Sequence, residues 1–206
     1  MTAPHRLTDR KREAIVSAAI AEFRDNGFEV TSMDKIAATA GVSKRTVYNH
    51  FPSKEELFSE ILHQMWANSV AQLDAAYDSN RPLREQLRIL LQAKMRMMAN
   101  PCFVDLARVA IAATIHSPER AQNMVSRLSK REEGFTQWVR SAQEDGRLSC
   151  TDPAFAAHQI QSLLKAFAFW PQVTLRQPPL DDASQAHAIE SAIDLFLAGY
   201  EVVPKA

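Results

Sequence analysis

Residues 43–54, SKRTVYNHFPSK, gather side chains that could read and hold a nucleic acid. The segment has three Lys or Arg and no Asp or Glu, whereas the whole chain of 206 residues has a formal net charge of zero. Lys44 and Arg45 can donate hydrogen bonds to guanine O6 and N7, and Asn49 can pair with N6 and N7 of adenine. Side chains with donors suited to phosphate stand in the same segment: Thr46, Tyr48 and His50.

The spacing within this segment predicts one short helix with two different faces. Val47 and Phe51 stand four residues apart and would form a buried inner face. The three base-contacting candidates would then point outward, as they must on a helix that enters the roughly 12 Å wide major groove. Ser43 is a favourable N-cap for this helix, and Pro52 forbids its continuation.

A second short helix is expected just before this one. Small and apolar residues recur there at helical spacing: Met33, Ile36, Ala37 and Ala40. Thr31 and Asp34 resemble a capping box at its start, and Gly41 ends it, which completes a helix-turn-helix pattern. Thr31 and Ser43 would stand where free backbone N–H groups attract phosphate, and Lys54 lies on the same side at the start of the next helix.

Each of these side chains, taken singly, has a simpler interpretation. Lys44 and Arg45 could be solvated surface charges, and Tyr48 could be a half-buried packing residue. His50 could cap or cross-link the motif. The prediction of nucleic-acid contact therefore depends on the whole set standing in register.

The rest of the chain also favours helices. Glycine is scarce, at 5 residues, and alternating runs typical of strands are missing. We expect an all-α protein of about nine helices, with an N-terminal helix-turn-helix domain in residues 1–55 and a helical domain in residues 56–206. Residues 1–8 should form a frayed arm, and a long fourth helix should leave the first domain. Helix boundaries after it are marked by proline and aspartate: Pro82, Pro101, Ser117-Pro118, Asp152-Pro153, Pro171 and Asp181 or Asp182.

Several other classes of protein find no support in the sequence. It contains no HExxH, no glycine-rich phosphate loop and no CxxC, so we expect no catalytic residues, metal site or cofactor. No apolar run approaches the roughly 18 residues of a membrane helix, and we expect a cytoplasmic protein associated with the nucleoid. Cys102 and Cys150 could pair, although buried thiols in a reducing cytosol are the favoured interpretation.

The segment FRDNGFEVTSMDKIAATAGVSKRTVYNHFPSKEELF resembles the DNA-binding domain of the TetR/AcrR family of bacterial transcriptional regulators. The likeness covers roughly residues 9–58 and departs from the commonest pattern at Arg45, where many members have glycine. Positions that match in register include Gly27-Phe28, Thr31, Ile36-Ala37, Ala40 to Ser43, Tyr48, His50-Phe51 and Ser53 to Glu55. The resemblance implies a double-stranded DNA operator, a homodimer and a divergent C-terminal helical domain that binds a small effector.

Large apolar side chains are frequent in the C-terminal part, where most should form an ordinary core. Some could instead line the implied effector pocket, because pockets in helical bundles are mostly apolar and Met side chains adapt to varied ligands. The candidates for this pocket are Trp66, Met95, Met98, Phe103 and Trp138.

The last two expected helices are more apolar than the core of one chain requires. In the resembling family, the corresponding helices pair with their copies. The candidates for the dimer interface are Leu163, Phe167, Ile189, Ile193, Phe196 and Leu197. A two-fold dimer would match a palindromic operator.

We therefore expect a dimeric repressor that a small apolar effector releases from its operator. Two alternatives stay open, a ligand-responsive activator and a ligand-independent regulator without an effector pocket. Activation and repression depend on where the operator lies relative to the promoter, which the sequence does not encode.

Overall fold

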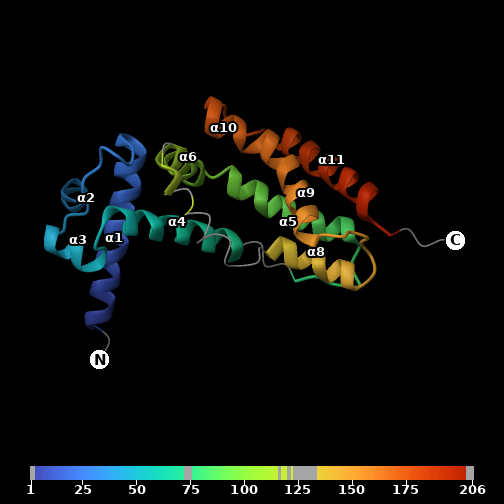
Figure 1. Cartoon of the computed structure of the whole chain (residues 1–206), viewed down its shortest axis with the longest axis horizontal. Helices are drawn as coiled ribbons and strands as arrows, with labels where there is room; N and C mark the ends of the chain where they lie inside the picture. Colours follow the sequence, from blue (N-terminus) through green and yellow to red (C-terminus); the bar gives the residue numbers. More distant parts are fainter. Residues whose placement is uncertain (1–2, 72–75, 116, 120–121, 123–133, 203–206) are drawn as a thin grey trace. The chain divides into compact units, whose positions relative to one another are not determined.

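The computed structural model describes residues 3–71, 76–115, 117–119, 122 and 134–202, which are almost entirely helical (Figure 1). The helices are α1 (Ala3–Asn26), α2 (Met33–Thr39), α3 (Lys44–His50), α4 (Lys54–Ala71), α5 (Leu83–Met98), α6 (Pro101–Ile115), α8 (Gly134–Glu144), α9 (Pro153–Ala168), α10 (Trp170–Leu175) and α11 (Asp182–Tyr200). Within these residues the β pairing consists of one isolated bridge between Leu148 and Glu201. The predicted all-α class is confirmed.

The chain forms two compact units. The N-terminal unit comprises residues 1–66 and 105–129, and the C-terminal unit comprises residues 67–104 and 130–206. The boundary therefore falls inside α4 and not at residue 55, where we divided the sequence by function. In addition, α6 packs mostly with the N-terminal unit, because its apolar side chains complete the core of that unit.

The core of the N-terminal unit draws on five helices. Representative buried side chains from α1, α2, α3, α4 and α6 are Phe23, Ile36, Val47, Leu57 and Val109. The ring of Phe23 meets that of Phe58 edge-on at a centroid distance of 5.4 Å, and Phe28 packs beside both. Burial of these aromatic groups supplies most of the apolar surface that holds the short helices α2 and α3 in place.

Two glycines with left-handed backbone angles set the turns of this unit. Gly27 (φ 82°) follows α1 and donates its N–H to the carbonyl of Phe23 at 2.9 Å, and Gly41 (φ 66°) separates α2 from α3. The predicted ends of both helices are thereby confirmed. The first helix, however, begins at Ala3, so residues 3–8 are not a frayed arm. Pro4 is tolerated in the first turn, since an N–H there has no partner within the helix.

Residues from α5, α8, α9 and α11 form the core of the C-terminal unit. Buried examples are Leu87, Leu91, Phe135, Trp138, Ile160 and Ile193. Asp152 caps α9 by accepting hydrogen bonds from the backbone N–H groups of Ala154 and Phe155, and Asp181 caps α11 in the same manner. These helix starts are those expected from the sequence. Helix α9 ends before Pro171, which stands in the first turn of a separate short helix, α10.

Two polar clusters fasten α5 to its neighbours. The buried Gln86 amide accepts hydrogen bonds from the Trp138 indole N–H (3.1 Å) and the Asp78 backbone N–H (2.9 Å). It also donates to the carbonyl of Asp78 at 2.8 Å, so the amide is satisfied on both sides. On the surface, Arg88 binds both carboxylate oxygens of Glu190 on α11. The sequence patterns did not reveal either cluster.

Candidate DNA-binding interface

Helix α3 is fixed at both ends by local hydrogen bonds. Ser43 is its N-cap, and the Ser43 Oγ accepts a hydrogen bond from the backbone N–H of Thr46 at 3.2 Å. The two hydroxyl groups also lie 2.8 Å apart. At the other end, the N–H of Phe51 donates to the carbonyl of Val47 at 2.8 Å, directly before Pro52. The helix therefore has the start and the end that its sequence predicts.

The inner face of α3 is buried as expected. Val47 is 0% exposed and Phe51 is also buried in the core of the N-terminal unit. The Arg12 guanidinium of α1 lies 4.5 Å from the centroid of the Phe51 ring and forms a 2.9 Å ion pair with Glu60 of α4. Both contacts fix the helix against its neighbours, so its outer face has a defined direction.

The outer face of α3 presents the predicted polar side chains to solvent. Lys44, Arg45 and Asn49 are exposed, and Tyr48 is 42% exposed. Thr46 and His50 are half-buried, and the His50 ring stands 6.4 Å from that of Phe51. The arrangement suits a helix that enters the major groove, while contact of each side chain with a base or a phosphate stays a prediction.

Lys44 forms an ion pair that the sequence did not suggest. The Lys44 Nζ lies 2.8 Å from one carboxylate oxygen of Asp34 and 2.9 Å from the other. The hydrogen bond and the charge of Asp34 raise the pKa of Lys44 above its usual value. Asp34 therefore joins α2 to the exposed side of α3.

Thr31 does not have the position expected from its capping-box spacing. Ser32 is the N-cap of α2, with its Oγ accepting a hydrogen bond from the N–H of Lys35 at 3.2 Å. Thr31 is 3% exposed, and its hydroxyl donates to the carbonyl of Gly27 at 2.7 Å and lies 3.1 Å from that of Glu22. Because the hydroxyl points inward, the assignment of Thr31 as a phosphate ligand is corrected to a structural role in this conformation.

Lys54 is half-buried at the start of α4 and already has partners within the chain. Its ammonium group donates to the carbonyls of Phe28 (2.7 Å) and Glu29 (3.1 Å) and lies 4.5 Å from the centroid of the Phe28 ring. These contacts tie α4 to the loop between α1 and α2. A contact between Lys54 and phosphate stays a prediction and would compete with these bonds.

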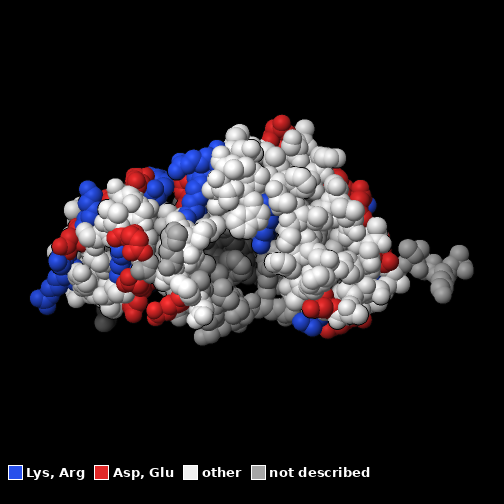
Figure 2. All heavy atoms as spheres, turned by 45° about the horizontal axis from the view of Figure 1, so that its top comes forward, with Lys and Arg blue, Asp and Glu red and all other residues white. Residues whose placement is uncertain are grey.

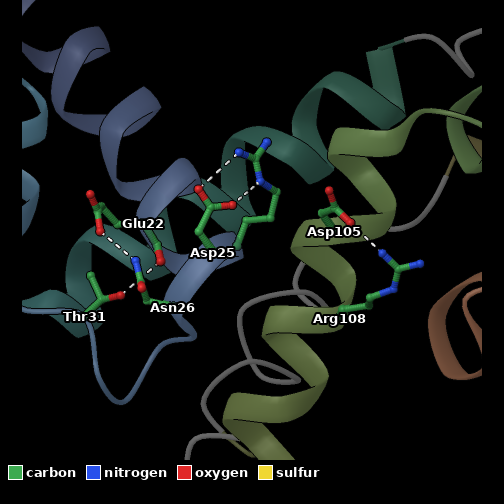
Figure 3. A network of polar contacts seen from close by, with 7 residues as sticks. Glu22, Asp25, Asn26, Thr31, Asp105 and Arg108 are labelled. Atoms are coloured by element: carbon green, nitrogen blue, oxygen red, sulfur yellow. Dashed lines mark hydrogen bonds and ion pairs between the residues drawn. The ribbon is translucent and has the colours of Figure 1, made fainter.

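A buried carboxylate, missed by the sequence analysis, links α1 to α2. Glu22 accepts hydrogen bonds from the Asn26 amide (2.9 Å) and the Thr39 hydroxyl (2.5 Å), and Figure 3 shows Asn26 and Thr31 gathered beside it. A helical wheel could have found it, since Glu22 follows the buried Ala18 and Ala19 by four and three residues. The network sets α2, and hence α3, against α1.

Charged side chains are unevenly distributed over the two units. Figure 2 shows Lys and Arg mixed with Asp and Glu over the N-terminal unit and few charges over much of the visible C-terminal unit. Residues 1–54 contain nine Lys or Arg and six Asp or Glu, and therefore have a net charge of +3. A positive balance favours binding to phosphates, because neutralised phosphates release counterions.

Two further findings bear on the classes of protein considered from the sequence. Among the residues that the structure describes, no three His, Cys, Asp or Glu side chains are grouped to hold a metal ion. No single helix in that part is long and apolar enough to cross a membrane, and α5 with α6 meets the length and composition test as a bent pair. Cys102 and Cys150 are free; Cys102 is exposed and Cys150 half-buried, so full burial was not found for either thiol.

The effector-pocket candidates lie in or against one hydrophobic core. Met95, Met98 and Trp138 are buried in the C-terminal unit, and Phe103 packs against the same cluster. The Phe103 ring stands 6.0 Å from that of Phe169. Trp66 belongs to the stretch of α4 whose side chains lie outside the described part of the structure. Binding of an effector by these residues stays a prediction.

The dimer-interface candidates separate into two groups. Ile189, Ile193, Phe196 and Leu197 of α11 belong to the core of their own chain, and Ile193 is 0% exposed. A side chain without accessible surface cannot contact a second copy, so these four are corrected to core residues. Phe167 of α9 is 61% exposed and Leu163 is half-buried, and both stay candidates. The heptad-like spacing on α11 marked the inward face of the helix.

Comparison with known proteins agrees with this arrangement. Residues 15–61 match the family described as "Bacterial regulatory proteins, tetR family", and residues 85–202 match the family described as "AefR-like transcriptional repressor, C-terminal domain". The crystal structure of a TetR family transcriptional regulator from Pseudomonas syringae pv. tomato is 55% identical, has a TM-score of 0.83, and is matched over 94% of this chain and 97% of that one.

Two other relatives extend the comparison. The flavonoid-responsive regulator FrrA is 27% identical with a TM-score of 0.76, matched over 96% of this chain and all of its own. The HTH-type transcriptional regulator RutR of Escherichia coli O157:H7 is 30% identical over 172 residues, which are 82% of this chain and 79% of RutR. The chain therefore belongs to the TetR family, and it is a DNA-binding transcriptional regulator.

Proposed function

We propose that the protein is a homodimeric repressor that places α3 of each copy in the major groove of a palindromic operator. A small apolar effector bound by the C-terminal unit would release it. The observation that carries the proposal is the division of α3 into a buried face, which contains Val47, and an exposed face, which contains Lys44, Arg45 and Asn49. Such a protein would act at the bacterial nucleoid, in the cytoplasm.

Base readout is assigned to the exposed donors of α3. Arg45 offers a planar fork that matches guanine O6 and N7, and Asn49 can pair with adenine. Tyr48, Thr46 and Ser43 stand beside them with hydroxyl groups that suit phosphate oxygens. Because Ser43 and Thr46 are near the start of α3, the N-terminal end of the helix would face the DNA.

The surface of α9 and α11 offers the best support for dimerisation. Phe155 and Phe167 of α9 are 58% and 61% exposed, and they are separated by three multiples of four residues, which keeps them near one helix face. Leu195 of the neighbouring α11 is 61% exposed. Small residues lie between them on the same helices, among them Ala166 and Ser191, and would allow close approach of a second copy. Exposed apolar groups gathered on paired helices are typical of subunit interfaces.

Support for an effector comes from the C-terminal core and from the relatives. The adaptable side chains Met95 and Met98 lie in the same unit as the aromatic pair Phe103 and Phe169. One structural relative, FrrA, is named as flavonoid-responsive. By analogy, we propose a small, largely aromatic or apolar effector for this chain, without assigning a compound.

Selection of bound DNA from a random double-stranded library tests the operator and the dimer together. We expect an inverted repeat whose half-sites are centred about 34–36 Å, or a multiple of that distance, apart. Sedimentation of the free protein should give twice the mass of one chain. Recovery of a single unrepeated site by a monomer would contradict the dimer proposal while leaving DNA binding intact.

The effector proposal needs a separate experiment. Thermal-shift screening with aromatic and apolar compounds should find ligands that raise the melting temperature, since a ligand at 100 times its Kd stabilises by about 2.7 kcal/mol. Near-complete release requires about 5 kcal/mol of preference for the non-binding state. Ligands that stabilise the protein and leave operator affinity unchanged would contradict release. A reporter with the operator overlapping its promoter distinguishes a repressor from an activator.

A further inference from the structure

The ion pair between α2 and α3 occupies a cation on the DNA-facing side of the motif. Lys44 is the first residue of α3, and its Nζ contacts both carboxylate oxygens of Asp34, at 2.8 and 2.9 Å. Both side chains are 61% exposed, so the pair stands in solvent and not in the core. A cation that already has an anionic partner cannot neutralise a phosphate without giving that partner up.

The position of the acidic residue is unusual in the sequence around it. Residues 30–54 contain four Lys or Arg, and Asp34 is their single acidic residue. The carboxylate is the second residue of α2 and does not cap that helix, because Ser32 performs this role. The Tyr48 ring, 5.9 Å from the Lys44 Nζ, lies on the same side and bounds the space available to the lysine.

We propose that Asp34 is a specificity-determining residue that lowers the affinity of the motif for DNA without an operator. Sequence-independent binding is mostly the sum of phosphate contacts by Lys and Arg, each of which releases counterions. Asp34 withholds one of these contacts by holding Lys44. If Lys44 nevertheless reaches a phosphate, the carboxylate stays within the Debye length of about 8 Å and repels it.

The same pair need not weaken binding to an operator to the same extent. Operator affinity includes base contacts, which we assign to Arg45 and Asn49, and neither side chain is bound to Asp34. Lowering the phosphate contribution while keeping the base contribution increases the ratio of operator to random binding. This ratio, rather than the affinity alone, determines how a regulator finds its site among many competing sequences.

The test compares Asp34→Asn with the unchanged protein on two duplexes, a random sequence and an operator selected by the unchanged protein. We expect Asp34→Asn to bind random DNA about threefold more tightly per recognition helix. The plot of log K against log salt should steepen by about 1 per helix, as one further phosphate is neutralised. Operator affinity should rise less, so the ratio between the two affinities should fall.

A double-mutant cycle shows whether the effect passes through Lys44. In a Lys44→Ala background, Asp34→Asn should change neither the affinity for random DNA nor the salt slope by more than a small fraction of the single-mutant effect. Asp25→Asn is the matched control, because it breaks a comparable exposed pair with Arg24 at 2.8 Å on another helix of the same unit (Figure 3). It should leave binding to both duplexes unchanged.

Three outcomes would overturn the proposal. Weaker binding of both duplexes by Asp34→Asn, with an unchanged melting temperature, would mean that Asp34 positions Lys44 for a productive contact. An equal gain in the Lys44→Ala background would mean simple charge repulsion without the ion pair. An equal gain for operator and random DNA would mean that the pair has no effect on specificity.

Discussion

Replacing Thr31 by valine distinguishes a structural role for this residue from contact with DNA. The substitution keeps the size of a side chain that is 3% exposed and removes a hydroxyl that donates to the Gly27 carbonyl at 2.7 Å. The carbonyl of Glu22, 3.1 Å from the same oxygen, also loses this neighbour. A buried polar group left without its partner costs about 1–3 kcal/mol, so we expect the free energy of unfolding to fall by about that amount.

The assay for Thr31→Val combines denaturant unfolding with salt-dependent DNA binding. Thr31→Ser is the matched control, because it keeps the hydroxyl and should lose less stability than Thr31→Val. Well below the unfolding transition, the slope of log K against log salt should equal that of the unchanged protein, since no phosphate contact has been removed. An unchanged stability together with a flatter salt dependence would refute the structural role and restore Thr31 as a phosphate ligand.

Three further predictions concern readout, the loop contact of α4 and the dimer. Arg45→Ala should cost about 1–3 kcal/mol on the selected operator and relax preference at one base pair per half-site; an operator-to-random ratio like that of the unchanged protein would exclude base readout. Lys54→Met should lower the melting temperature as well as DNA affinity, because the ammonium group leaves the carbonyls of Phe28 and Glu29; loss of affinity alone would show that these bonds add no stability. Leu195→Asp should give folded monomers in sedimentation, whereas Ile193→Asp should unfold the C-terminal unit in circular dichroism, since Ile193 is 0% exposed. An intact dimer of Leu195→Asp would place the interface elsewhere.

The sequence predicted α3 well because its signals are local. Ser43 and Pro52 bound the helix, and Val47 and Phe51 stand at the spacing of one buried face, so the outward direction of Arg45 follows from geometry alone. Caps at Asp152 and Asp181 located α9 and α11 for the same reason. In each case the residues that decide the structure lie within a few positions of one another.

The misplaced residues depend on contacts between distant parts of the chain. Thr31 and Asp34 have the spacing of a capping box, but their actual partners are the carbonyl of Gly27 and the ammonium group of Lys44. Helical spacing also identified the apolar face of α11 without showing whether the chain itself or a second copy covers it. Packing against α5 and α9 buried Ile193, which periodicity alone could not decide.

The contribution of α6 to the N-terminal core limits how this regulator can be taken apart. Leu106, Val109, Ala110 and Ala113 are buried in the same cluster as Phe23 and Ile61. A fragment that ended at residue 66 would expose the apolar surface that these four side chains cover, and would be prone to associate through it. Hybrid regulators made by joining this reading head to a foreign sensor should therefore carry α6 along, or recreate its apolar face in the new partner.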